Sequence, residues 1–161
     1  MVIIVMGVSG TGKTTIGKAL AKKLDADFYD ADDYHPKENK EKMASRKPLN
    51  DEDRKPWLRR LSRLIKNHLE TNTTMVLACS ALKKKYRNTL HASDPQVTLI
   101  FLTADYEVLK SRLQNRDSHF FPAELINSQL ETLEKPEDAL EIDVSACRET
   151  VLENIVNTLL H

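Results

Sequence analysis

The apolar residues of this chain fall into short continuous runs and into stripes at helical spacing, and the two alternate. The runs at 2–6, 74–79 and 97–102 have the length and β-branched content of buried strands, and shorter strand patterns lie at 28–29 and 140–144. Apolar stripes predict helices over 13–24, 51–69, 82–90 and 105–113, a helix led by Pro122, and a last helix over 151–160. Asp51 is the expected cap of the longest helix.

Strands that alternate with helices predict an α/β fold with a central parallel sheet of about five strands, right-handed crossovers and helices on both faces. With 161 residues and no linker or repeat, residues 1–161 are expected to form a single domain. Sheets of this kind bind their ligands at the carboxyl ends of the strands. The residues that directly follow each predicted strand are therefore the first candidates for a functional site.

A phosphate-binding loop connects the first predicted strand to the first predicted helix. Its residues match the pattern G-x-x-x-x-G-K-[ST], with glycine where backbone N–H groups must turn inward around phosphate oxygens. Lys13 is expected to reach the β- and γ-phosphates of a nucleotide, and the Thr14 hydroxyl is expected to bind its Mg²⁺. The predicted nucleotide-binding residues of the loop are Gly7, Val8, Ser9, Gly10, Thr11, Gly12, Lys13 and Thr14.

Composition narrows the class of protein further. The 24 basic and 24 acidic side chains cancel, which argues against a dedicated nucleic-acid or membrane-surface binder. The first apolar run is too short for a signal-peptide core or a membrane span. The two cysteines form neither a disulfide framework nor a metal-binding pattern. A cytoplasmic location is therefore expected. All four glycines lie between Gly7 and Gly17, so later turns must rely on Asn, Asp, Ser and Pro.

Charged residues outside the loop indicate a kinase of small metabolites. Asp30, Asp32 and Asp33 follow the second strand, so their carboxylates should lie at the same sheet edge as the phosphate loop, although acidic loops are also common as solvated surface. Arg112 and Arg116 span the end of a helix, as expected of a mobile lid that brings arginines to phosphates, but the same spacing is typical of a solvated helix face. The chain lacks the N-K-x-D motif that reads guanine, which disfavours a GTPase.

Longer strings of residues resemble the gluconokinase family. They lie at 28–36, 39, 42–43, 48–51, 53–54, 56–58, 78–83, 86–87, 119–120, 128–129 and 132–134. The resemblance runs from Met6 to about Pro136. It implies a three-layer phosphate-loop NTPase fold of the nucleoside-monophosphate-kinase-like group, with a small lid near 116–122. The implied reaction transfers phosphate from ATP, with Mg²⁺, to the 6-hydroxyl of D-gluconate, giving 6-phospho-D-gluconate and ADP.

The resemblance also implies a role for each candidate site residue. The implied catalytic residues are Lys13, Asp30, Asp32 and Arg116, with Asp30 supporting Mg²⁺ through water and Asp32 orienting or deprotonating the sugar hydroxyl. The division of roles among the three aspartates stays open. ATP is expected to be held by residues 7–14 with Arg112 and Arg116. The implied gluconate-binding residues are Asp32, Asp33, His35, Arg54, Lys83, Arg87 and His119. His35 has an alternative role as the cap of a helix that Pro36 begins.

Two other functions stay open, and the chain departs from the family pattern at some turn positions. A kinase of another small acid such as shikimate is disfavoured by the strings at 35–36 and 56–57, and a non-catalytic nucleotide-dependent binding module would need no acceptor. Arg46 and Ala104 stand where the family is expected to carry glycine, which requires residue 104 to adopt negative φ. Dimers are common in the family, so a homodimer is one expected state, although no interface can be recognised in the sequence.

Overall fold

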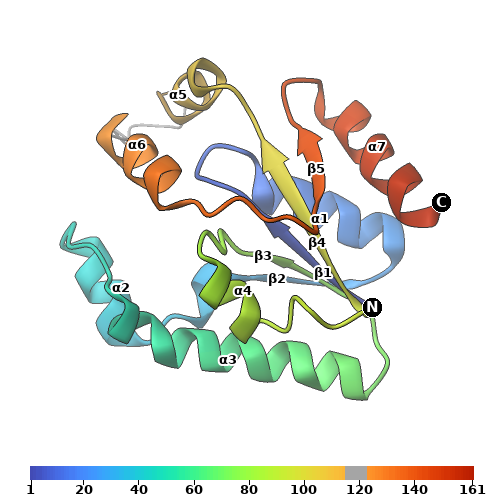
Figure 1. Cartoon of the computed structure of the whole chain (residues 1–161), viewed down its shortest axis with the longest axis horizontal. Coiled ribbons are helices and arrows are strands. Elements are labelled where there is room, and N and C mark those ends of the chain that lie inside the picture. Colours follow the sequence, from blue (N-terminus) through green and yellow to red (C-terminus); the bar gives the residue numbers. More distant parts are fainter. Residues whose placement is uncertain (115–122) are drawn as a thin grey trace.

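Within the described residues, which are 1–114 and 123–161 of a computed structural model, five strands form one parallel sheet in the order β2-β3-β1-β4-β5 (Figure 1). The strands are β1 (Val2–Met6), β2 (Asp27–Asp30), β3 (Met75–Ala78), β4 (Val97–Thr103) and β5 (Leu140–Asp143). The α-helices are α1 (Lys13–Leu24), α2 (Lys37–Ala44), α3 (Asp51–Glu70), α4 (Lys84–Thr89), α5 (Tyr106–Gln114), α6 (Ala123–Thr132) and α7 (Arg148–Leu160), and a 3₁₀ helix, η1 (Ala31–Tyr34), follows β2.

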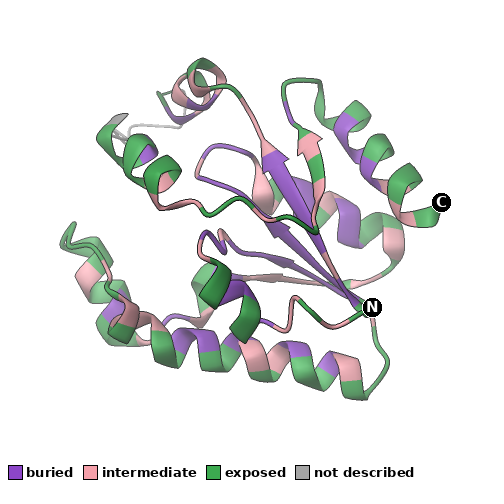
Figure 2. Ribbon diagram, in the orientation of Figure 1, coloured by how far each residue is buried: buried purple, intermediate pink, exposed green. Residues whose placement is uncertain are grey.

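The strand β1 lies in the middle of the sheet and is covered on both faces, which explains why its sequence is apolar without a break. Ile3 and Val5 pack with apolar residues of α1 and α7, whereas Val2, Ile4 and Met6 pack on the opposite face with residues of α3. All five residues are completely buried. The central strands are coloured as buried in Figure 2. The predicted α/β architecture, with helices on both faces of a parallel sheet, is confirmed.

The observed elements differ from the predicted ones in a few boundaries. Asp51 does not cap α3; the cap is Asn50, whose Oδ1 accepts the N–H of Asp53 at 2.8 Å while Asp53 Oδ2 accepts the N–H of Asn50 at 2.9 Å. This reciprocal pair leaves the Asp51 carboxylate available for other contacts. Helix α7 begins at Arg148, ahead of the predicted start at residue 151.

The predicted lid at 116–122, with Pro122, lies outside the described residues. Among the helices that the structure describes, none is both long and apolar enough to cross a membrane.

Because glycine is scarce, residues of other types occupy several turns that adopt the left-handed backbone conformation. Positive φ occurs at Asp25, Arg46, Asn72, Ala81 and His91. Asp, Asn and His tolerate this region better than other side-chain-bearing residues. Asp25 and Asn72 follow the expectation from the sequence, whereas Arg46 and Ala81 are the residues for which this region is least favourable. Residue 104 is not among the residues with positive φ, as its alanine requires.

Replacing Arg46 by glycine is expected to stabilise the protein. Arg46 has φ 60° directly after α2, its N–H donates to Met43 O at 3.0 Å, and the N–H of Lys47 donates to Lys42 O at 3.0 Å. This is the Schellman arrangement that favours glycine, because a Cβ costs energy in the left-handed region. We expect Arg46→Gly to raise the free energy of unfolding by about 0.5–1 kcal/mol in urea denaturation. The control Arg46→Ala keeps the Cβ, and an equal gain in that variant would contradict the explanation.

Candidate active site

The phosphate loop joins the carboxyl end of β1 to the start of α1. A Cβ on Gly7 would lie 2.8 Å from Leu102 O, and Gly12 has φ 86°, so glycine is required at both positions. Gly12 has no side chain to cap α1, and the helix begins directly at Lys13, with its N-terminus turned toward the loop. The N–H groups and partial positive charge of a helix N-terminus favour phosphate. The predicted loop therefore has the backbone geometry of a phosphate cradle.

Asp30 connects this loop to the end of β2. Its Oδ2 accepts the Thr14 hydroxyl at 3.0 Å, and its Oδ1 accepts the N–H of Asp32 at 3.0 Å, so one carboxylate caps η1 and holds a loop side chain. Trp57 of α3 fixes the same turn, since its Nε1 donates to Ala31 O at 2.7 Å. Hydroxyl and carboxylate oxygens are the hard donors that Mg²⁺ prefers, so the pair formed by Thr14 and Asp30 fits the predicted metal site.

Asp32 and Asp33 are adjacent in sequence but line two different hollows, which meet at Asp30. Asp32 lines a hollow with the phosphate loop, whereas Asp33 lines a separate surface depression with Lys18, Phe28 and Tyr34. Desolvation in the hollow and then the charge of Asp30 raise the pKa of Asp32, and the charge of Lys13 opposes this shift. A carboxylate with a raised pKa beside a phosphate-binding lysine is suited to accept a proton.

The hollow that contains Asp32 has a volume of about 240 Å³ and lies between the phosphate loop, the ends of β2 and β3, and α6. Lys13 lines it and donates from Nζ to Val8 O at 3.2 Å. Cys79, at the end of β3, also lines it; burial raises the pKa of its thiol to about 12, so this group stays protonated at neutral pH. The other lining residues are Ser9, Gly10, Gly12, Thr14, Asp30, Ala78, Ser80 and Gln129.

A second hollow, of about 270 Å³, lies on the opposite side of the phosphate loop, against the segment between β5 and α7. Arg112 of α5 lines it and donates from Nη2 to Val144 O at 2.5 Å. Arg148, at the first position of α7, and the apolar side chains of Ile16 and Val151 complete its wall. Arg112 thus lies beside the phosphate loop, and its contact with ATP stays a prediction. Arg148 has no motif of its own from which the sequence could have placed it in this hollow.

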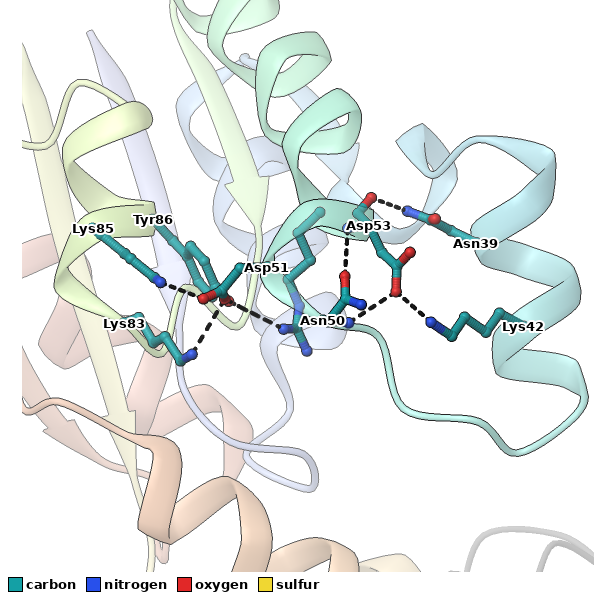
Figure 3. Close-up of polar contacts among 9 residues, drawn as sticks. Asn39, Lys42, Asn50, Asp51, Asp53, Lys83, Lys85 and Tyr86 are labelled. Atoms are coloured by element: carbon teal, nitrogen blue, oxygen red, sulfur yellow. Dashed lines mark hydrogen bonds and ion pairs between the residues drawn. The ribbon is translucent and has the colours of Figure 1, made fainter.

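Cationic side chains gather around Asp51 where α3 and α4 begin (Figure 3). The Asp51 carboxylate accepts hydrogen bonds from Lys83, at 3.3 Å, and from Lys85 and the Tyr86 hydroxyl, and it lies 4.0 Å from Arg54 Nη1. The hydrogen bonds from Lys85, then Tyr86, and then Lys83 hold the pKa of Asp51 below its usual range. Arg54 also donates to the Tyr86 hydroxyl at 3.1 Å. Two of the implied gluconate-binding residues, Arg54 and Lys83, therefore meet in one cluster.

Two other implied gluconate-binding residues are occupied by contacts inside the protein. His35 is buried, stacks on Trp57 with ring centroids 4.4 Å apart, and has its pKa lowered to about 4, first by burial and then by the charge of Arg54. Arg87 is buried as well and donates to three carbonyl oxygens, those of Ala81, Leu82 and Glu134. Both side chains thus shape the walls around the site, and their contact with substrate stays a prediction. Arg116 and His119 lie outside the described residues.

Comparisons with known proteins agree with this geometry. The family model of shikimate kinase matches residues 9–154. A probable gluconokinase of Xenopus tropicalis is 46% identical over 89% of this chain and 85% of its own length, and the thermoresistant gluconokinase of Escherichia coli K12 is 40% identical over 98% and 93%. The crystal structure of a gluconokinase from Sinorhizobium meliloti has a TM-score of 0.81 at 37% identity and covers 98% of this chain and 94% of the other.

Shikimate kinase from Aquifex aeolicus shares the fold, with a TM-score of 0.63, but only 18% of the sequence. The gluconokinases match at more than twice that identity over almost the whole chain, so this chain is more similar in sequence to them than to that shikimate kinase. The protein belongs to the gluconokinase family.

Proposed function

We propose that this protein transfers the γ-phosphate of ATP to the 6-hydroxyl of D-gluconate, producing 6-phospho-D-gluconate and ADP. The observation that carries the proposal is that Lys13, Thr14 and Asp32, whose pKa is raised, line one hollow. Phosphoryl transfer depends mainly on positioning and on stabilising charge, so these few groups suffice for its chemistry.

The donor side of the reaction uses the phosphate loop. Loop N–H groups and the N-terminus of α1 bind the phosphates, Lys13 neutralises charge on the transferred group, and Thr14 with Asp30 hold Mg²⁺. Mg²⁺ supplies charge neutralisation between the phosphates when it is bound. The hollow beyond the loop, with Arg112 and apolar walls, is the place for the nucleotide base.

The acceptor side uses Asp32. Its carboxylate accepts the proton of the 6-hydroxyl as that oxygen attacks phosphorus, and the bond between the γ-phosphorus and the bridging oxygen of ADP breaks. A general base must be ionised at the working pH and must still bind a proton strongly. The raised pKa of Asp32 increases its affinity for the proton. Asp33, which lines a different hollow, then has no part in this proton transfer.

The carboxylate of gluconate binds the cations that now hold Asp51. Arg54, Lys83 and Lys85 carry three positive charges against the single charge of Asp51, so the cluster has positive charge to offer to an acidic substrate. Lys83 comes three residues after Ser80, which lines the hollow that contains Asp32. Three residues of extended chain span at most about 11 Å. This spacing suits a six-carbon acid whose carboxylate and 6-hydroxyl lie at opposite ends.

Replacing Arg54 by glutamine is expected to raise KM for gluconate by about tenfold or more, because a charge-assisted hydrogen bond is worth about 1.5–3 kcal/mol. KM for ATP should change by less than about twofold, since Arg54 lies in the acceptor cluster and not at the phosphate loop. Steady-state kinetics with each substrate varied in turn measure both values. Arg59→Gln, on an exposed position of the same helix, is the matched control. An unchanged KM for gluconate would place the carboxylate elsewhere.

An assay of ADP release tests the proposed function directly. Purified protein with ATP and Mg²⁺ should release ADP in proportion to added D-gluconate, and ³¹P NMR should show a phosphomonoester at carbon 6. Shikimate, assayed in parallel, should give far less turnover. ATP binding without turnover on either acid would instead support the non-catalytic binding module.

A cytoplasmic location and a homodimer remain part of the proposal. The composition supports the first through its cysteine usage, and analytical ultracentrifugation decides the second.

A further inference from the structure

Gln129 of α6 contacts the phosphate loop with both ends of its carboxamide. Its Oε1 accepts the backbone N–H of Ser9 at 2.7 Å, and its Nε2 donates to the Ser9 hydroxyl at 2.9 Å. The two residues are 120 positions apart in sequence. Ser9 lines the hollow that contains Asp32 and is absent from the walls of the hollow on the nucleotide-base side. The contact therefore acts on the half of the loop that faces the acceptor.

The position of Gln129 is fixed by the rest of α6. Ile126 of the same helix is buried with Val8 and Leu109, so the helix packs against the loop region and α5. Just after the helix, the N–H of Glu134 donates to Leu82 O at 2.8 Å, and Glu134 O accepts from Arg87 at 2.7 Å. The helix end is thus fastened to the segment after β3, which forms the acceptor side. Gln129 links this anchored region to the donor loop.

We propose that Gln129 is a positioning residue for phosphoryl transfer, which holds Ser9 and the adjoining loop in place for the γ-phosphate. The inference rests on the proposed function, because it names what aligns the donor loop with the acceptor in that reaction. A carboxamide suits the task, since it offers an acceptor and a donor side by side to match the N–H and the hydroxyl of one serine. It also adds no charge to a hollow that already contains Asp30 and Asp32.

The test uses the full-length variant Gln129→Met, which keeps the size and helix propensity of the side chain but makes neither hydrogen bond. We expect kcat to fall by about tenfold to hundredfold, as for the misplacement of a reacting group, while KM for gluconate changes by less than about twofold. Glu131→Gln, at an exposed position on the same helix, should leave both values unchanged. A kcat within twofold of the unmodified protein would overturn the proposal.

Two further measurements separate positioning from a merely structural role. Affinity for a non-hydrolysable ATP analogue should weaken in Gln129→Met while affinity for ADP stays the same, because only the γ-phosphate reaches the acceptor half of the loop. Equal losses for both nucleotides, or a large fall in melting temperature, would show a structural role and overturn the proposal. The double variant of Ser9→Ala and Gln129→Met should be no slower than Gln129→Met alone, and additive losses would show that Gln129 does not act through Ser9.

The nucleotide measurements keep this inference distinct from the proposed function. If the unmodified protein fails to phosphorylate gluconate, the proposed function is wrong. The ratio of affinities for the ATP analogue and ADP still decides whether Gln129 positions the loop for a γ-phosphate.

Discussion

Replacing Lys13 by alanine is expected to lower kcat by about 10³-fold, because a fixed charge at the site of developing negative charge is among the largest contributions to catalysis. Lys13 is the first residue of α1, lines the reaction hollow and donates to Val8 O in the loop. In the proposed reaction its ammonium group is the cation that accompanies the transferred phosphate. The coupled assay of ADP release measures the loss.

The stability of the Lys13→Ala variant should change much less than its activity. Lys13 is only partly buried and alanine is a good helix former, so the melting temperature should stay within a few degrees of that of the unmodified protein. Lys23→Ala, at an exposed position of the same helix, is the matched control and should keep normal kcat. A loss below tenfold in Lys13→Ala, or an unfolded variant, would contradict the assigned role.

Local sequence patterns predicted the parts of this protein that local physics determines. The run at residues 2–6 must lie in a sheet covered on both faces, since five successive apolar residues cannot alternate between core and water. The position of the acidic turn at Asp30 follows from the same reasoning, because parallel strands bring their carboxyl ends to one edge. The phosphate loop and its nearest carboxylates were therefore recognisable from the amino-acid sequence alone.

The start of α3 contains a local signal that the prediction of Asp51 as the cap overlooked. Both Asn50 and Asp51 are good capping residues, and the choice depends on the residue three positions further along. Asp53 can return a hydrogen bond to the N–H of Asn50, whereas Arg54 has no acceptor to return one to Asp51. The consequence is functional, because the carboxylate of Asp51, which caps no helix, is the group around which Lys83, Lys85 and Tyr86 gather.

Other features of the site could not be predicted because they depend on contacts between distant segments. The residue type shows that an arginine or lysine side chain can bind an acid. It does not show whether that side chain already forms hydrogen bonds within the protein, as the buried Arg87 does. The contact between Gln129 and Ser9 likewise has no local pattern, since it depends on how α6 packs after the fold has formed. Residue type identified the candidates, and packing showed which of them are already held by contacts inside the protein.

Asp32→Asn is expected to lower kcat by about 10²–10⁴-fold, the usual contribution of a positioned general base. The asparagine side chain is nearly isosteric with the aspartate side chain. The backbone N–H of residue 32, which donates to Asp30, is unchanged, so the turn after β2 should be preserved. ATP affinity should stay within about threefold, since the proposed role of Asp32 is to accept the proton of the sugar hydroxyl and not to bind the nucleotide. Near-normal kcat in this variant would exclude Asp32 as the base. Asp25→Asn is the control, because Asp25 is exposed at the far end of α1 and asparagine tolerates its positive φ.

The pH dependence provides the second test of Asp32. Its pKa is raised by desolvation and then by the charge of Asp30, so activity should fall on the acid side as pH drops through this raised value and the base becomes protonated. Asp30→Asn removes one of the charges that raise the pKa of Asp32, so the acid limb of kcat/KM in the residual activity should move to lower pH.

The effect of Asp32 on stability has the opposite sign to that of an ion-paired carboxylate. Ionised Asp32 is disfavoured in the fold, so Asp32→Asn should be slightly more stable than the unmodified protein at neutral pH. That difference should shrink as pH falls toward the pKa of an unfolded aspartate, and a difference that grew instead would contradict a raised pKa.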